Sequence, residues 1–311
     1  MPPTPPPGRL IDVGTHRLHL HCLGIGTPAV VFDAALGASS LSWSLVHPAV
    51  ATLTRACVYD RAGFGWSEAG PLPRTAGRVA DELHALLRAA SIDPPFLLVG
   101  HSFGGLVAQL FTARHRDDVA GLVLIEPAIP EEWAAPPPER QVLIAKGERL
   151  CRYGEAAARY GIARMISALA RAGALTPARA LVRLVSRGGL QRQDEGVLAP
   201  VGKLPPDVRR LVGQAWVQPK FFSALGSQIG SICESAAEVV REAMPHYGQL
   251  PLALITSQDA QPARMRADAV LASRSQRGRH VLAANSGHWV PLDAPQVVIE
   301  TIAAVLAETR P

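Results

Sequence analysis

The fold is decided by one stretch of sequence, Phe96-Leu97-Leu98-Val99-Gly100-His101-Ser102-Phe103-Gly104-Gly105-Leu106-Val107. Its apolar start is typical of a buried strand, its centre is a Gly-x-Ser-x-Gly turn, and its end has apolar residues at helical spacing. A strand, a sharp turn and a helix in this order are the context of a nucleophile elbow, and small residues on either side of the serine avoid clashes in the turn. We therefore predict that Ser102 is a nucleophile and that the backbone N–H of Phe103, at a helix N-terminus, stabilises an oxyanion.

Strand-like runs continue on both sides of this segment. They lie at Arg17–His21, Ala29–Phe32, Ala56–Tyr59, Phe96–Val99, Val119–Ile125, Leu252–Thr256 and His280–Ala283. The stretch Arg74–Ala90 between two of them has apolar residues on one helical face, as does the last helix from about Pro295. Strands that alternate with helices predict an α/β fold with a mostly parallel sheet and helices on both of its faces.

The alternation stops in residues 131–246, where helical segments follow a Pro-Pro-Pro break without a convincing strand. We interpret this block as a helical cap inserted into the sheet domain, folded over the carboxyl edge of the strands, where ligands bind in open α/β sheets. The predicted organisation is a flexible Pro-rich leader at 1–9, a core at 10–130 and 247–311, and the cap at 131–246.

Composition excludes several classes of protein. Of 311 residues, 48% are hydrophobic and 18% are charged, which excludes a disordered chain. The sequence has no apolar run long enough to span a membrane and no secretion signal at its start, so we expect a soluble, cytoplasmic protein. Its four cysteines, Cys22, Cys57, Cys151 and Cys233, lack metal-type spacing, and we interpret them as reduced core thiols.

The net charge of +5 is unevenly distributed, because residues 139–220 hold 15 Lys or Arg against 6 Asp or Glu. Aromatic residues are not interleaved there, so we predict no nucleic-acid partner. Residues 156–187 interleave arginines with apolar residues in a basic amphipathic pattern. A solvated or core-packed helical surface explains this pattern, and contact with an anionic membrane is the alternative.

A serine nucleophile needs a base, and position selects one of the ten histidines. His288 follows the last strand-like run and precedes the last helix, which places it at the same sheet edge as Ser102. His101 adjoins the serine and is expected to line the elbow. His16, His19 and His21 lie at or beside one strand-like run and are expected on one solvated or loop-facing side; without supporting carboxylates they do not indicate a metal site.

Two carboxylates compete to orient His288. Asp259 follows the first strand after the cap, whereas Glu126 ends the strand next to the nucleophile strand. The sequence leaves both open, with Asp259 slightly favoured.

Together these motifs resemble the α/β-hydrolase superfamily, specifically its capped serine hydrolases. The resemblance rests on Gly100–Gly105, on Tyr59–Ser67, which is similar to a D-x-x-G-x-G-x-S loop, and on Ser286-Gly287-His288. It implies a second oxyanion donor in the loop after Phe32, where Ala34-Ala35 replace the usual His-Gly and the donor N–H falls on Leu36. It also implies that Asp259 is one residue closer to Pro251 than is usual for the acid.

The resulting expectation is a cofactor-free serine hydrolase with a small carboxylic ester or related acyl substrate carrying an apolar group. Substrate-binding side chains are predicted at Trp43, Phe64, Trp66, Trp289 and His101. Serine at the elbow disfavours the epoxide hydrolases and dehalogenases that the resemblance includes, since these use aspartate there. Perhydrolase, thioesterase or peptidase activity with the same triad, or a ligand-binding protein without catalysis, are the alternatives. The sequence does not indicate an oligomeric state.

Overall fold

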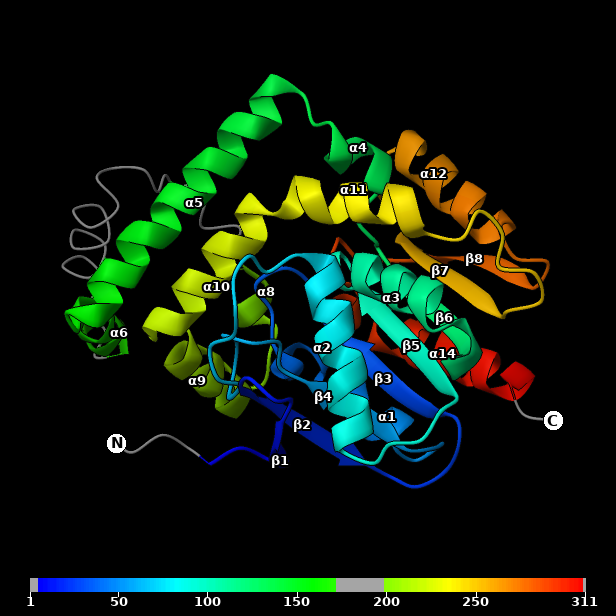
Figure 1. Cartoon of the computed structure of the whole chain (residues 1–311), viewed down its shortest axis with the longest axis horizontal. Coiled ribbons are helices and arrows are strands. Elements are labelled where there is room, and N and C mark those ends of the chain that lie inside the picture. The colour runs from blue at the N-terminus through cyan, green and yellow to red at the C-terminus, as the bar shows by residue number, and fades with distance from the viewer. Residues whose placement is uncertain (1–4, 172–198, 310–311) are drawn as a thin grey trace.

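The computed structural model describes residues 5–171 and 199–309, and its centre is one eight-stranded sheet (Figure 1). The strands are β1 (Arg9–Asp12), β2 (Arg17–Leu23), β3 (Ala29–Asp33), β4 (Ala56–Tyr59), β5 (Phe96–His101), β6 (Val119–Ile125), β7 (Leu252–Ser257) and β8 (Gly278–Ala283). Their order across the sheet is β1-β2-β4-β3-β5-β6-β7-β8. The pairs from β4 to β8 are parallel, which confirms the mostly parallel sheet, while β2 pairs antiparallel with both β1 and β4.

The N-terminal edge of the sheet differs from the prediction. Strand β1 was not expected, and it begins at Arg9, inside the segment interpreted as a flexible leader. The carbonyl oxygen of Pro7 also lies 2.6 Å from the His19 Nε2 atom, so the leader is attached to β2 from this residue on. The four residues of β1 are mostly exposed, which explains why hydrophobic periodicity did not reveal the strand.

Helices cover both faces of the sheet. One face packs against α2 (Ala76–Ala89), α3 (Phe103–Arg114) and α12 (Pro262–Ser273), and the other packs against α1 (His47–Val50) and α14 (Pro295–Thr309). Successive residues of β5 alternate between the two cores, with Leu98 in the first and Leu97 and Val99 in the second. This burial on both faces explains why the central strands consist of continuous runs of apolar residues.

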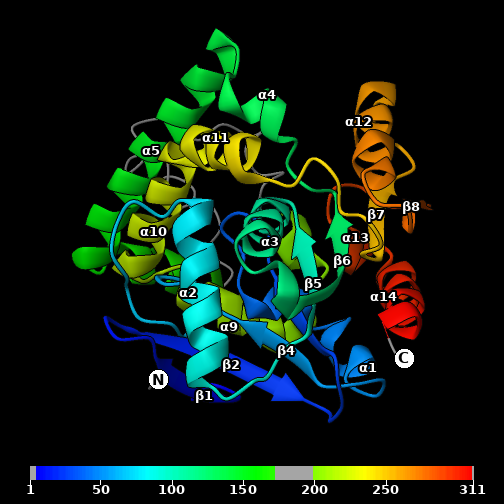
Figure 2. The same cartoon turned by 45° about the vertical axis from the view of Figure 1, so that its right-hand side comes forward.

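Between β6 and β7, the elements that the structure describes are all helices. They are α4 (Pro130–Ala134), α5 (Pro138–Arg159), α6 (Ile162–Arg171), α8 (Ala199–Gly202), α9 (Pro206–Ala215), α10 (Pro219–Gly230) and α11 (Ile232–Glu242). In Figures 1 and 2 the green and yellow helices α4, α5, α10 and α11 lie together. The sequence predicted such an inserted helical block. Of its basic amphipathic stretch at 156–187, residues 172–187 lie outside the described residues.

Helix α10 contacts loops that follow two parallel strands, which locates this helix at the carboxyl edge of the sheet. After β4, a Cβ atom on Gly63 would lie 2.3 Å from the Ala224 Cβ atom, and the Lys220 ammonium donates to the carbonyl oxygens of Gly65 and Ser67 at 3.1 and 2.6 Å. After β3, the Gly37 N–H donates to the Gln228 side chain at 3.4 Å. The close approach at Gly63 requires a residue without a side chain.

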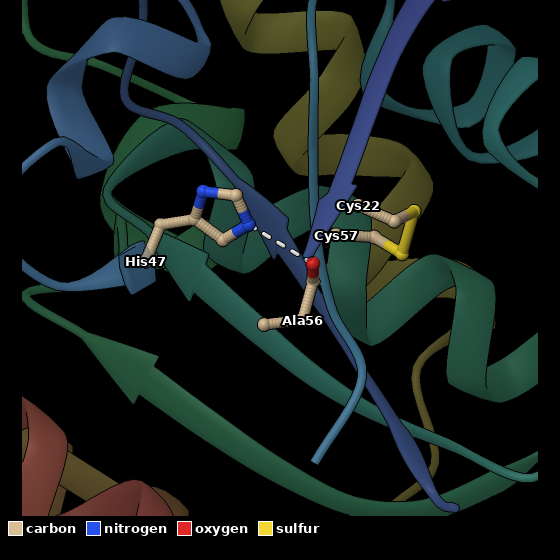
Figure 3. Close-up of a disulfide and its surroundings, with 4 residues drawn as sticks. All are labelled: Cys22, His47, Ala56 and Cys57. Atoms are coloured by element: carbon tan, nitrogen blue, oxygen red, sulfur yellow. Dashed lines mark hydrogen bonds between the residues drawn. A yellow bond between two sulfur atoms is a disulfide. The ribbon is translucent and has the colours of Figure 1, made fainter. Parts of the chain in front are cut away.

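The expectation of four reduced thiols is wrong for two of them. Cys22 of β2 and Cys57 of β4 are directly opposed in the antiparallel register and form a disulfide (Figure 3). Beside it, the His47 Nε2 atom lies 2.9 Å from the carbonyl oxygen of Ala56. The two cysteines are 35 residues apart, and only strand pairing brings them together. Cys151 and Cys233 are free.

The histidines near the N-terminus were expected on one solvated or loop-facing side. His16 and His19 are buried, and His19 faces the loop after β4, where its Nδ1 atom lies 2.9 Å from the buried Asp60 carboxylate. Both ring nitrogens of His19 therefore face acceptors, since Pro7 lies at the other one. Burial lowers the pKa of His19, but Asp60 and the Pro7 carbonyl outweigh it, so the net shift of the pKa is upward.

None of the helices within 5–171 and 199–309 combines the length and apolar character needed to cross a membrane.

Candidate active site

Ser102 occupies the strained turn that the sequence predicts between β5 and α3. Its backbone has φ 54° and ψ −113°, a conformation that is costly for a residue with a side chain, by about 1–3 kcal/mol. Three hydrogen bonds hold it: its N–H donates to the Ile125 carbonyl at 2.9 Å, and its carbonyl accepts from the N–H groups of Gly105 and Ala128 at 2.9 and 3.1 Å. A strained backbone conformation that surrounding hydrogen bonds enforce is typical of a functional residue.

The glycines around Ser102 are required because neighbouring segments of the chain come too close to leave room for a Cβ atom. A Cβ atom on Gly100 would lie 2.4 Å from the carbonyl oxygen of Gly104. A Cβ atom on Gly104 would lie 2.4 Å from the carbonyl oxygen of Asp33, and one on Gly105 would lie 2.6 Å from Pro127. The turn can therefore close only with glycine at these positions, and Gly104 brings the loop after β3 against the start of α3.

His288 lies in the segment between β8 and α13 (Val290–Asp293), where its Nδ1 atom is 3.3 Å from the Glu126 Oε2 atom. The other Glu126 oxygen accepts the backbone N–H of Ser257 at 2.7 Å. Burial raises the pKa of Glu126, but these two hydrogen bonds outweigh it and the net shift is downward, so the carboxylate is ionised at neutral pH. A fixed, ionised carboxylate at Nδ1 favours the tautomer of His288 whose Nε2 atom is free to accept a proton.

The two candidate acids differ in what they contact. Asp259 lies in the turn after β7 with an exposed side chain, and its backbone N–H donates to the Ser257 Oγ atom at 3.2 Å. Glu126, in contrast, is buried at the end of β6 with a backbone φ of 45°, and its N–H donates to the Ile255 carbonyl at 2.8 Å. Within the described residues, Glu126 is the carboxylate that contacts His288.

His101 is buried beside the elbow and supports the His288 loop. Its Nε2 atom lies 2.8 Å from the carbonyl oxygen of His288, so this nitrogen is the donor. Burial, and next the nearby charge of His288, lower the pKa of His101 to about 3. His101 is therefore neutral at physiological pH, and its donating nitrogen is committed to the backbone.

The loop after β3 is held by Arg61, whose role was not apparent from the sequence. Its Nε atom donates to the Asp33 carboxylate at 2.8 Å, its Nη1 atom donates to the Ala35 carbonyl at 3.2 Å, and its Nη2 atom donates to the Ala34 carbonyl. The Asp33 carboxylate also accepts from the Tyr59 hydroxyl at 2.9 Å. In a trans peptide the C=O and the N–H point in opposite directions, so the N–H of Leu36 is turned away from Arg61.

The guanidinium of Arg61 also lies over the ring of Phe103, 4.9 Å from its centroid. This residue therefore contacts both segments that are predicted to supply oxyanion donors. Phe103 opens α3, so its backbone N–H is among those that lack an intrahelical partner.

The predicted pocket side chains separate into core and surface positions. Trp43 is buried against Phe32 with ring centroids 4.9 Å apart, and Phe64 is buried against Phe221 of α10 at 5.8 Å. Trp66 is half-buried beside His19, with ring centroids 4.9 Å apart.

Trp289 is half-buried next to the catalytic candidates, with its ring centroid 5.2 Å from that of His101. It belongs to an apolar cluster that joins the cap to the core. The cluster consists of Leu204, Val208, Val212 and Leu292, with Leu41, Leu45, Val201, Trp216 and Trp289 at its margin. Helices α8 and α9 thus contribute apolar side chains to the cluster that holds Trp289, the residue after His288, and the sequence did not indicate this contribution.

Comparison with known proteins identifies relatives of this architecture. The model of a family described as "Alpha/beta hydrolase family" matches residues 18–301. The uncharacterized protein YqjL of Bacillus subtilis is 36% identical over 109 residues, which cover 35% of this chain and 43% of YqjL. A haloalkane dehalogenase of Sphingobium indicum is 30% identical over 131 residues, which cover 40% of this chain and 44% of the dehalogenase. The chain thus aligns with less than half of the length of either protein.

Solved structures show the same fold over nearly the whole chain. A thermophilic esterase from Thermogutta terrifontis superposes with a TM-score of 0.64 at 20% identity, covering 95% of both chains. A putative epoxide hydrolase from Pseudomonas aeruginosa superposes with a TM-score of 0.70 at 20% identity, covering 99% of both chains. At this identity the likeness concerns the fold.

Proposed function

Because the chain belongs to the alpha/beta hydrolase family, we propose that it is a serine hydrolase that cleaves a carboxylic ester or a related acyl bond through Ser102, His288 and Glu126. The observation that carries this proposal is the left-handed backbone of Ser102 between β5 and α3, since a strained serine between a strand and a helix is the geometry of a nucleophile elbow. The Glu126 carboxylate, 3.3 Å from the His288 Nδ1 atom, orients the base that the serine needs.

The proposed reaction follows from these contacts. The Ser102 Oγ atom attacks the substrate carbonyl while His288 Nε2 takes its proton, and the Glu126 carboxylate at Nδ1 stabilises the imidazolium. The N–H groups of Phe103 and Leu36 stabilise the oxyanion. His288 then protonates the leaving group, and a water molecule, deprotonated by His288, hydrolyses the acyl-enzyme. No step requires a cofactor.

The choice of ester over epoxide or haloalkane rests on the nucleophile. Relatives include proteins named as an esterase, as epoxide hydrolases and as a haloalkane dehalogenase. Opening an epoxide or displacing a halide through an alkyl-enzyme ester needs a carboxylate nucleophile, and position 102 is serine. Perhydrolase, thioesterase and peptidase activities remain alternatives because they would use the same triad.

An apolar group on the substrate is supported by the cluster around Trp289. Cap residues Leu204, Val208 and Val212 meet core side chains next to the His288 loop, which favours an acyl or alcohol group without charge.

The cytoplasmic location stays a prediction. The Cys22–Cys57 disulfide weighs against it, because disulfides persist mainly in oxidising compartments. Contact of the basic cap with anionic lipid also stays an alternative, and flotation with anionic vesicles at low salt tests it.

The test of the proposed function is fluorophosphonate labelling combined with p-nitrophenyl ester hydrolysis. We expect wild type to label and turn over, Ser102→Ala to do neither, and His288→Ala to lose turnover. Glu126→Gln should lower kcat by about 10²–10⁴-fold, whereas Asp259→Asn, a matched carboxamide at an exposed position, should keep it within about twofold. Loss of kcat in Asp259→Asn instead of Glu126→Gln would reverse the assignment of the acid. Wild type that neither labels nor hydrolyses short esters would favour a ligand-binding protein without catalysis.

A further inference from the structure

We propose that His84, His115 and Asp118 form a binding site for a divalent transition-metal ion of the Zn²⁺ type, separate from the candidate active site. Each of the three side chains offers one ligand atom, and these atoms all lie within 4.8 Å of one another. Two imidazoles with one carboxylate are a donor set that suits Zn²⁺, Co²⁺ or Ni²⁺ better than Mg²⁺ or Ca²⁺, which prefer oxygen donors alone.

The three residues come from segments whose positions are fixed by the fold. His84 lies in α2, His115 directly follows α3, and Asp118 ends the 3-10 helix η2 (Arg116–Asp118). The N–H of Asp118 donates to the His115 carbonyl at 3.1 Å, so the turn holds these two residues at a set spacing. Because α2 packs against α3, His84 is brought to this turn without a local sequence signal.

The ligand atoms are already close to metal-binding spacing. Ligands at about 2.0–2.2 Å from a tetrahedral ion lie roughly 3.3–3.6 Å from one another. The His84 Nε2 atom is 3.5 Å from the Asp118 Oδ2 atom, within this range. The rings of His84 and His115 are stacked, with centroids 3.7 Å apart and planes at 12°, so their in-plane lone pairs point in parallel and both rings must rotate before their nitrogens can share one ion.

A buried aromatic side chain forms the wall behind the two histidines. The Phe111 ring meets His84 with centroids 5.9 Å apart and His115 at 5.1 Å, both edge to face. On the other side, the side chains of His84 and Asp118 are 23% and 30% exposed, so an ion can enter and water can complete its coordination.

Charges near the site are balanced. The guanidinium of Arg114, next to His115, is paired with Asp81 at 2.9 Å and with Glu242 at 2.8 Å, which reduces its repulsion of a cation. Helix α3 begins after Ser102 and has 12 residues, which separates the cluster from the serine by about 18 Å. The ion would therefore join α2 to the end of α3 and take no part in hydrolysis.

The test is Zn²⁺ titration of untagged, EDTA-treated full-length protein by calorimetry, with thermal unfolding in parallel. We expect one Zn²⁺ per chain and a Tm that rises with Zn²⁺ concentration, because an ion that binds only the folded state stabilises it. His84→Gln and His115→Gln should each weaken binding at least about tenfold, and Asp118→Asn should weaken it less. His246→Gln, at an exposed histidine elsewhere, serves as the matched control and should bind like wild type.

Absence of stoichiometric binding to wild type would overturn the proposal, as would unchanged affinity in both His84→Gln and His115→Gln. The Tm of each metal-free variant shows whether it is folded. If the histidine variants are unfolded, Co²⁺ spectra of wild type and Asp118→Asn decide: a shift of the visible bands supports ligation by this carboxylate, and identical spectra contradict it.

Discussion

Arg61→Lys tests how the predicted oxyanion loop is held. Lysine keeps the positive charge but loses the planar fork that bonds the Asp33 carboxylate together with the carbonyls of Ala34 and Ala35. The Ala35 carbonyl and the Leu36 N–H belong to one peptide. Without the Arg61 contact this carbonyl keeps its bond from the Ala38 N–H at 3.1 Å but loses the other one, so the donor is held less firmly. We therefore expect the loss to appear in catalysis as well as in stability.

The expected loss of kcat follows from the contribution of a single oxyanion donor. One oxyanion donor contributes about 10²–10³-fold in kcat, or about 2.7–4 kcal/mol. Because this interaction is made in the transition state, kcat should fall by up to this factor while KM changes little, and the pH profile should be unchanged. The lysine ammonium can still pair with the Asp33 carboxylate but cannot replace all of the lost hydrogen bonds. The free energy of unfolding should therefore fall by about 1–3 kcal/mol.

Arg74→Lys is the matched control for this experiment. Arg74 is equally buried and pairs with Glu82, but it lies before α2, away from the elbow. It should lose a comparable free energy of unfolding, measured in urea, and keep its kcat for a p-nitrophenyl ester. A kcat of Arg61→Lys within about threefold of wild type, or an equal loss of kcat in Arg74→Lys, would show that Arg61 does not hold the oxyanion donor.

Two further predictions concern the buried histidine and the elbow glycine. The pKa of His19 is raised by its Asp60 partner, so its contribution to stability is fully present below about pH 6.5 and is lost as the pH rises through the folded-state pKa. In urea unfolding from pH 5 to 9, the deficit of His19→Gln relative to wild type should shrink with rising pH; a constant deficit would contradict the ion pair. Gly104→Ala should abolish ester hydrolysis and lower stability, because its Cβ would lie 2.4 Å from the Asp33 carbonyl oxygen. Gly213→Ala lies in α9, where no neighbouring atom of residues 5–171 and 199–309 is within 4 Å of the added Cβ. It should keep activity and raise stability by up to about 1 kcal/mol, and equal behaviour of the two variants would contradict the effect of packing at Gly104.

The features that the sequence predicted well are those with a local physical cause. The strand, turn and helix around Ser102 follow from apolar periodicity and from glycines where two backbones meet, and both signals lie within a dozen residues. The central strands are buried on both faces, so their continuous apolar runs are easily distinguished from the flanking sequence. Strand β1 has neither property and was missed for that reason.

The features that were missed depend on contacts between distant segments. The Cys22–Cys57 disulfide requires the antiparallel register of β2 and β4, which no spacing of cysteines encodes. For His19, alternation along a strand left open whether its side is solvated or covered by a loop. The Asp60 loop lies over that side and buries His19.

Arg61 shows the same limit within a recognisable motif. Its position in Tyr59–Ser67 was clear from the sequence, but its partner Asp33 and the two carbonyls it holds lie in a different loop. From the sequence alone, a charged residue in such a motif is equally consistent with a solvated and with a buried side chain. What distinguishes Arg61 is that its buried guanidinium meets a buried carboxylate, and this juxtaposition exists only once β3 and β4 pair in parallel.

The acid illustrates why chain order alone left two answers open. Glu126 and Asp259 both follow parallel strands, β6 and β7, whose carboxyl ends meet at one edge of the sheet, so each is within reach of a histidine loop there. The difference lies in anchoring. The Glu126 carboxylate accepts the Ser257 N–H and its backbone N–H is bonded to Ile255, so its side chain is fixed, whereas the Asp259 side chain is exposed to water. A carboxylate can orient an imidazole only if it is itself immobilised, and a sequence records the presence of the carboxylate but not its anchoring.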